Sequence, residues 1–246
     1  LVEKGTLYQI YNKNLLFHGC IPCYPDGRLL SVTFGETSYQ GKALMDFYQE
    51  CLKQSLAEPT CTSDLATDVL WYLWCGEGSS LFGKKTMKTF ERYFISNKHT
   101  HTEEKNAYYT LREEEEFCCG LLAEFGLEPT GHIINGHTPV KVKKGETPIK
   151  ANGRLLVIDG GLSRSYQEVT GIAGYTLLYN SFGMTLAAHQ PFTDRQTAIK
   201  ERKDILTQKK IVVRQTKRIT VRQTDIGKQL QIESTRLLEK NNPIKN

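Results

Sequence analysis

The sequence predicts a mixed α/β fold. Short runs of aromatic and branched apolar residues, bounded by glycine, occupy residues 1–36 and 130–192 and are typical of strands. Between them, residues 40–126 carry apolar side chains at helical spacing. Strands, a long helical block and further strands in this order predict mixed sheets with a helical insertion.

The first strands are expected at residues 6–11, which alternate, and at residues 14–17, an apolar run that ends at His18 and Gly19. In the helical block, Ser63-Asp64 could cap a helix over residues 65–74. The cluster formed by Trp71, Tyr72, Leu73 and Trp74 in this helix is expected in the core. Residues 110–113 have the form of a capping box ahead of a helix that stops at Gly126.

Further strands are expected at residues 133–134, 155–158, 175–179 and 184–188. The tail opens with a polar helical stretch to about Leu206. Residues 210–224 and 229–234 then alternate in the manner of edge strands.

Charge divides the chain unevenly. The 246 residues carry a net charge of +5, and residues 195–246 alone carry +9. We therefore expect two parts, residues 1–194 with the helical block 40–126 inserted, and a basic, β-rich extension over residues 195–246. The extension contains no aromatic residue for base stacking, so a nucleic-acid partner is not expected. An acidic partner surface or a small anionic effector fits its charge as well.

Composition also bounds the location of the chain. No run of 18 apolar residues is present, so no membrane span is expected. Seven cysteines in a chain with enough apolar residues for a core favour a reducing cytoplasm. The chain starts at Leu1 with neither an initiator Met nor a signal peptide, and we expect it to be part of a longer protein.

Two histidines are the first candidates for chemistry. His18 and His137 each follow a predicted strand and adjoin glycine. In open α/β sheets the carboxyl ends of strands form the crevice where ligands bind, and neutral imidazole is a common metal ligand. A hydrogen-bonded turn residue is the alternative for each of them.

The cysteines and the glycine-rich turns are weaker candidates. Cys20 and Cys23 have C-x2-C spacing, but a zinc site would require a second spaced pair, and Cys118-Cys119 lies inside a predicted helix. Residues 159–164 and 170–175 could cradle phosphate through backbone N–H groups, or they could be tight turns between strands.

These motifs resemble a known family. The strings LLFHGCIP at residues 15–22, DVLW at residues 68–71 and NGHTPV at residues 135–140 resemble elements of calcineurin-like metallophosphoesterases. The narrower strings WYLWCG at 71–76, LFGK at 81–84 and TFERYF at 89–94, with residues 159–192, resemble the class III fructose-1,6-bisphosphatases of bacteria. The resemblance extends over essentially the whole chain.

The resemblance implies the C-terminal half of a metallophosphoesterase β-sandwich and a cytoplasmic enzyme of gluconeogenesis that releases the 1-phosphate of fructose 1,6-bisphosphate. Two cations, Mn²⁺ by expectation, would bind the phosphate and activate a bridging hydroxide for in-line attack. By motif match, His18 and His137 are ligands of one metal. His132 does not fit the motif.

The family's D-x-H, GD-x-x-D and GNH-[DE] elements, which supply the other metal ligands and the proton donor, do not occur in this sequence. We therefore expect that the chain alone holds no catalytic proton donor, carries at most two of the metal ligands and does not hydrolyse the substrate. Candidate phosphate contacts are Arg112, whose position resembles that of a phosphate-binding Arg, together with Tyr108 and Arg164.

Two alternatives remain. The chain could belong to a phosphoprotein phosphatase of the same superfamily, although the stretch between His18 and His137 carries the sugar-phosphatase strings. It could also act only as a regulatory or interaction module that binds an anionic effector or another subunit. Assembly into a homo-oligomer is left open by the sequence.

Overall fold

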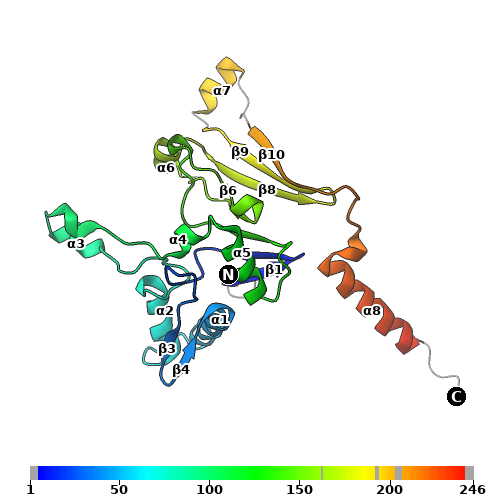
Figure 1. The fold of residues 1–246 in the computed structure, drawn as a ribbon, viewed down its shortest axis with the longest axis horizontal. Coiled ribbons are helices and arrows are strands. Elements are labelled where there is room, and N and C mark those ends of the chain that lie inside the picture. The colour runs from blue at the N-terminus through cyan, green and yellow to red at the C-terminus, as the bar shows by residue number, and fades with distance from the viewer. Residues whose placement is uncertain (1–4, 162, 192–193, 203–206, 242–246) are drawn as a thin grey trace. The chain divides into compact units, whose positions relative to one another are not determined.

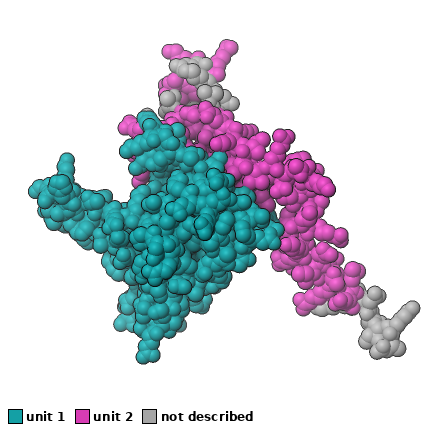
Figure 2. Space-filling model, in the orientation of Figure 1, with its two compact units in different colours: residues 1–159 teal, residues 160–246 magenta. Residues whose placement is uncertain are grey.

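The computed structural model describes residues 5–161, 163–191, 194–202 and 207–241. The chain divides into two compact units, Leu1–Asp159 and Gly160–Asn246 (Figure 2). The boundary precedes the division at residues 194/195 expected from charge, because one sheet takes strands from both sides of residue 195. The mixed α/β fold class is confirmed.

The first unit is built on a five-stranded sheet with the order β1-β2-β5-β7-β6. Its outer strands β1 and β6 are labelled in Figure 1. Its central strands β2, β5 and β7 are parallel, and β1 and β6 flank them in antiparallel pairing. Parallel strands are normally covered on both faces, which explains their apolar sequences. The strands are β1 (Tyr8–Tyr11), β2 (Asn14–Phe17), β5 (His132–Asn135), β6 (Ile149–Lys150) and β7 (Leu155–Val157).

The β1–β2 hairpin confirms the first predicted strands. Asn12 and Lys13 form its two-residue turn, and both have positive φ angles, 48° and 66°. Two central residues with positive φ characterise the type I′ turn, whose twist matches that of the flanking strands. A second hairpin pairs β3 (Val32–Phe34) with β4 (Thr37–Tyr39).

The helical block lies between β4 and β5, as predicted. It comprises α1 (Gly41–Ala57), α2 (Leu65–Cys75), α3 (Thr89–Phe94), α4 (Tyr108–Leu111) and α5 (Glu115–Glu124), with the 3-10 turn η1 (Lys98–His101). The predicted cap is confirmed, since the Asp64 side chain accepts a hydrogen bond from the Thr67 N–H at 2.8 Å.

Within this block, one prediction holds only in part and another is wrong. Leu73 of the predicted core cluster is buried, on the face of α2 that Ala66 and Val69 share, but Trp71 and Trp74 lie on the opposite face, 64% and 59% exposed. The capping box at residues 110–113 does not form. The Asn106 side chain accepts from the Tyr108 N–H, so a short helix starts earlier and already ends at Leu111.

The second unit contains a three-stranded antiparallel sheet in the order β10-β9-β8. Its strands are β8 (Gly174–Asn180), β9 (Gly183–His189) and β10 (Thr207–Arg214), and its helices are α6 (Arg164–Thr170), α7 (Arg195–Glu201) and α8 (Asp225–Asn241). The strands predicted at 175–179 and 184–188 are confirmed. Leu162, and Leu206 at the end of the expected polar helix, lie outside the described residues.

The expectation of a β-rich tail is only half right. β10 covers the start of the predicted strand at 210–224, but residues 221–223 form the 3-10 turn η4 (Val221–Gln223). Residues 229–234 are helical, within α8. Thr224 caps this helix by accepting from the Gly227 N–H at 3.1 Å, and the helix-forming residues after it outweigh a short alternation.

A search of the described residues for a membrane-crossing helix finds none with the required length and apolar character.

Candidate active site

The structure brings His18 and His137 together. Each follows one of two adjacent parallel strands, β2 and β5, so both rings lie at the carboxyl edge of the sheet. His18 Nε2 and His137 Nδ1 are 3.0 Å apart. The rings meet edge to face, with centroids 5.0 Å apart.

The backbone fixes this pair from both sides. The Gly136 N–H donates to the His18 carbonyl at 2.9 Å, which joins the two strand ends. His137 itself has a φ of 65°, in the left-handed region that a non-glycine residue adopts at a cost of order 1–3 kcal/mol. Strain of this kind tends to persist where a side chain must point in one direction, here toward His18.

Gly19 is required by the next contact. A Cβ atom at residue 19 would lie 2.2 Å from the Ser80 carbonyl oxygen. That same oxygen accepts from the Cys20 N–H at 2.9 Å. The close approach of these two segments sets the course of the chain immediately after His18.

Electrostatics favour the neutral form of His137. Burial lowers the pKa of His137, and the neighbouring His18 ring lowers it further. A neutral imidazole presents a lone pair, which is the form that binds a metal ion.

The donor set fits two ligands of one cation. Two nitrogens that each bind an ion at about 2.1 Å at right angles to each other are about 3 Å apart, and the observed separation of the histidine nitrogens is 3.0 Å. Among the residues that the structure describes, no group of three His, Cys, Asp or Glu side chains could hold a metal. The pair can therefore supply part of a coordination shell.

Asn135, the last residue of β5, and Tyr108 hold the segment around the histidine pair through buried hydrogen bonds. Asn135 is 1% exposed, and its amide donates to the Gly19 carbonyl and the Tyr108 hydroxyl, both at 3.0 Å. The Tyr108 side chain is fully buried and packs edge to face on Phe17. In this structure Tyr108 thus orients Asn135 from the core, and its predicted role as a substrate contact stays a prediction that this burial does not favour.

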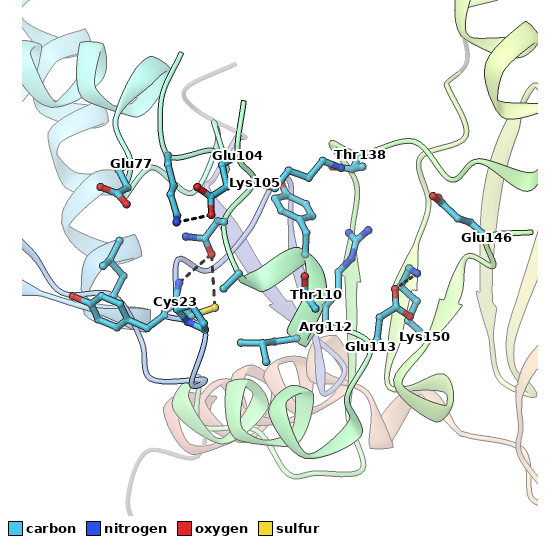
Figure 3. A pocket seen from close by; sticks show the side chains of 18 of the residues that line it. Cys23, Glu77, Glu104, Lys105, Thr110, Arg112, Glu113, Thr138, Glu146 and Lys150 are labelled. Carbon is cyan, nitrogen blue, oxygen red and sulfur yellow. Dashed lines mark hydrogen bonds and ion pairs between the residues drawn. The ribbon is translucent and has the colours of Figure 1, made fainter. Parts of the chain in front are cut away.

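Arg112 lies at the end of α4 and lines a cavity of about 680 Å³ (Figure 3). It is 6% exposed, and its Nε and Nη1 atoms have no hydrogen-bond partner. Thr138 and Pro139, which follow His137, line the same cavity. The cavity that Arg112 lines is thus also lined by the two residues that directly follow the predicted metal ligand His137.

Arg164 is the first residue of α6 in the second unit, and its side chain lies outside the described residues. The C-x2-C cysteines are buried free thiols, as is Cys118. Burial raises the pKa of Cys23 to about 12, so its thiol stays protonated. Buried, protonated thiols of this kind are typical of core residues and not of zinc ligands, which are thiolates.

Sequence reasoning missed Lys105, Tyr109 and Lys141, which also line the Arg112 cavity. A signal was present: Lys105, Tyr109 and Arg112 are spaced by four and three residues, a spacing that brings side chains to one side of a turn of helix. No such signal pointed to Lys141, because its position at the Arg112 cavity depends on the path of the loop after β5.

Comparisons with known proteins agree on one family. The family model for Firmicute fructose-1,6-bisphosphatase matches residues 1–241. A protein named class 3 fructose-1,6-bisphosphatase from Enterococcus faecalis is 59% identical over 240 residues, which cover 96% of this chain and 38% of that protein. The proteins of the same name from Bacillus velezensis and Lactococcus lactis subsp. cremoris are 52% and 51% identical, over 98% and 94% of this chain and 37% and 36% of theirs.

The chain thus spans little more than a third of the length of these curated relatives. No solved structure matches it significantly.

Proposed function

The chain belongs to the Firmicute fructose-1,6-bisphosphatase family, and from this premise we propose that it forms part of the active site of a phosphoric monoester hydrolase acting on fructose 1,6-bisphosphate. The observation that carries the proposal is the His18–His137 pair at the carboxyl edge of parallel strands. The family match supports the proposed substrate. A cytoplasmic location and a calcineurin-like arrangement belong to the same proposal.

In this proposal His18 and His137 hold one divalent cation, with Mn²⁺ as the expected ion. Imidazole nitrogens suit manganese, zinc and iron alike, so the ion is chosen by its other ligands and its availability. When bound, such a cation stabilises charge on phosphoryl oxygens and lowers the pKa of water. The chain's own part is to place two imidazole nitrogens 3.0 Å apart and to hold them there through Gly136 and Gly19.

The remaining ligands and the proton donor are proposed to come from outside residues 5–161. Within the described residues no third ligand joins the pair, which supports a shared site rather than a complete one. The 246-residue chain is accordingly expected to release no phosphate from fructose 1,6-bisphosphate when it is assayed alone.

The test is Mn²⁺-dependent phosphate release by the complete protein that carries this chain, with fructose 1,6-bisphosphate and a phosphopeptide assayed in parallel. Release from the sugar alone, abolished by His18→Ala and by His137→Ala, is the expected result. His99→Ala, at an exposed site in η1, is the matched control and should retain activity.

Two outcomes would contradict the proposal. Release from the phosphopeptide alone would support the protein-phosphatase alternative. Release by the 246-residue chain alone, lost on His18→Ala, would show that the chain needs no outside ligand.

A further inference from the structure

We propose that the Arg112 cavity is an anion subsite that binds the phosphate group which fructose 1,6-bisphosphate keeps after hydrolysis. This inference rests on the proposed function for the identity of the sugar. It assigns Arg112, Lys105 and Lys141 to the 6-phosphate, whereas the histidine pair belongs to the phosphate that is released.

The first support is Arg112 itself. A guanidinium that is 94% removed from solvent ordinarily has a carboxylate partner, because desolvating an unpaired charge is costly. None of the ion pairs within the described residues includes Arg112, and its Nε and Nη1 atoms lack hydrogen-bond partners. The guanidinium lies over the face of the Tyr109 ring, 5.0 Å from the guanidinium carbon to the ring centroid, a contact that compensates part of this cost.

The second support is the convergence of other cations on the same space. Lys105 Nζ lies 5.3 Å from the centroid of the same Tyr109 ring. Burial lowers the pKa of Lys105, and the positive charges of Lys141 and Arg112 lower it further. Three cations therefore repel one another across the cavity, and a bound dianion would relieve this repulsion.

Two of the acidic residues of the cavity wall are paired with lysines other than Lys105 and Lys141, namely Lys85 and Lys150 of the same wall. Glu104 pairs with Lys85 at 2.6 Å, and Glu113 pairs with Lys150 (Figure 3). Glu146 accepts from the Lys141 backbone N–H at 2.9 Å, although its charge also acts on Lys105. Glu77 lies on the wall as well, and its charge acts on Lys85.

Neutral groups complete the surroundings of Arg112. Cys20 lies close enough to interact with its charge, and burial raises the pKa of this thiol, so it does not act as a counter-anion. Burial likewise raises the pKa of the Tyr108 and Tyr109 hydroxyls. The positive charge of Arg112 therefore has no anion in contact, and the cavity is where one can enter.

Size and position agree with a sugar phosphate. A cavity of about 680 Å³ falls in the range of small-molecule sites, which is about 300–1,000 Å³. Its wall includes Thr138, the residue after His137. A ligand seated in the cavity would thus extend from Arg112 toward the segment that carries the histidine.

The experiment is calorimetric titration of the 246-residue chain with fructose 6-phosphate, fructose and inorganic phosphate, in the presence of EDTA. The chelator removes any contribution from a metal at the histidine pair. We expect fructose 6-phosphate to bind at one site, inorganic phosphate more weakly, and fructose at least about tenfold more weakly than its phosphate ester.

Three variants test the assignment. Arg112→Gln should weaken fructose 6-phosphate binding by at least about tenfold. Lys105→Gln, at a residue more exposed to solvent than Arg112, should weaken it several-fold, which keeps the test decisive if Arg112→Gln fails to fold. Arg28→Gln removes an exposed arginine that is paired with Asp26 and should leave binding unchanged.

Binding that none of the cavity variants alters, or no binding of fructose 6-phosphate at all, would overturn the inference. The complete protein separates the two proposals. Release of phosphate from fructose 1,6-bisphosphate with an unchanged KM in Arg112→Gln and Lys105→Gln would keep the function and overturn the subsite. Binding of fructose 6-phosphate through Arg112 without any release of phosphate would do the reverse.

Discussion

At the scale of single residues, the candidate sites contain two residues that are in states unfavourable by themselves, one in its backbone conformation and one in its burial. His137 has a left-handed backbone, and Arg112 is buried without an anionic partner. Both features cost free energy in the folded chain, so each is expected where the arrangement serves a ligand.

His132 gives a residue-scale prediction about pH. Burial lowers the pKa of His132 below its usual value of 6.5, and the charge of Arg154 lowers it further. Below pH 6.5 the unfolded chain therefore binds a proton that the folded chain resists, so the free energy of unfolding should fall as the pH falls. His132→Gln should make the loss of stability between pH 7.5 and 5.5 smaller, as measured by urea denaturation.

The control for this prediction is His99→Gln, on the exposed turn η1. It should show the same loss of stability on acidification as the unmodified chain. Equal pH dependence in His132→Gln and the unmodified chain would mean that His132 does not contribute to acid sensitivity.

At the scale of elements, the helical block shows how local signals compete. The Asp64 cap forms as predicted, because Asp is a strong N-cap residue and the Thr67 N–H lies within its reach. The predicted box at residues 110–113 does not form, because Asn106 starts a helix earlier. Two similar capping sequences thus differ in outcome: one forms its hydrogen bond in the folded chain and the other does not, because the surrounding structure places the start of the helix elsewhere.

The cap of α2 carries the element-scale prediction. Asp64→Ala removes the acceptor for the Thr67 N–H and should lower the free energy of unfolding by about 1 kcal/mol. Thermal unfolding monitored by far-UV circular dichroism measures the effect. Ser63→Ala, one residue before the cap, is the matched control. An equal loss of stability in both variants would contradict a specific role of Asp64 as the cap.

At the scale of the whole molecule, the histidine pair and the Arg112 cavity belong to one unit. All residues assigned to either lie within Leu1–Asp159, whereas the basic tail lies in Gly160–Asn246. This separation assigns binding of the sugar phosphate to the first unit and leaves the charge of the second unit for another partner. An anionic effector and a further subunit remain the proposed partners of that tail.

A truncated chain of residues 1–159 tests this division. It should fold, because all strands of the five-stranded sheet and helices α1 to α5 lie within it, and it should bind fructose 6-phosphate in EDTA with the affinity of the 246-residue chain. Circular dichroism and calorimetry give the two readouts. A folded truncated chain that does not bind would show that the second unit contributes to the cavity.

The sequence by itself determined the mixed fold class, most strands, the helical block and both histidines. These features depend on local alternation, helical spacing and short motifs, which act between residues close in the chain. Residues 229–234 form part of helix α8 and not the predicted strand, because the cap at Thr224 starts a 17-residue helix that includes this short alternation.

Only the tertiary structure decided where these residues meet. Ring nitrogens of His18 and His137 lie 3.0 Å apart because β2 and β5 pair in parallel across 114 intervening residues, which include the β3–β4 hairpin and five helices, and local pattern does not encode this pairing. The outward position of Trp71 and the convergence of Lys105, Arg112 and Lys141 likewise follow from how helices and loops pack. Burial and charge repulsion are sums over all neighbours in space. Arg112 was a candidate from the sequence, but for that reason its burial and the approach of Lys105 and Lys141 became visible only in the folded chain.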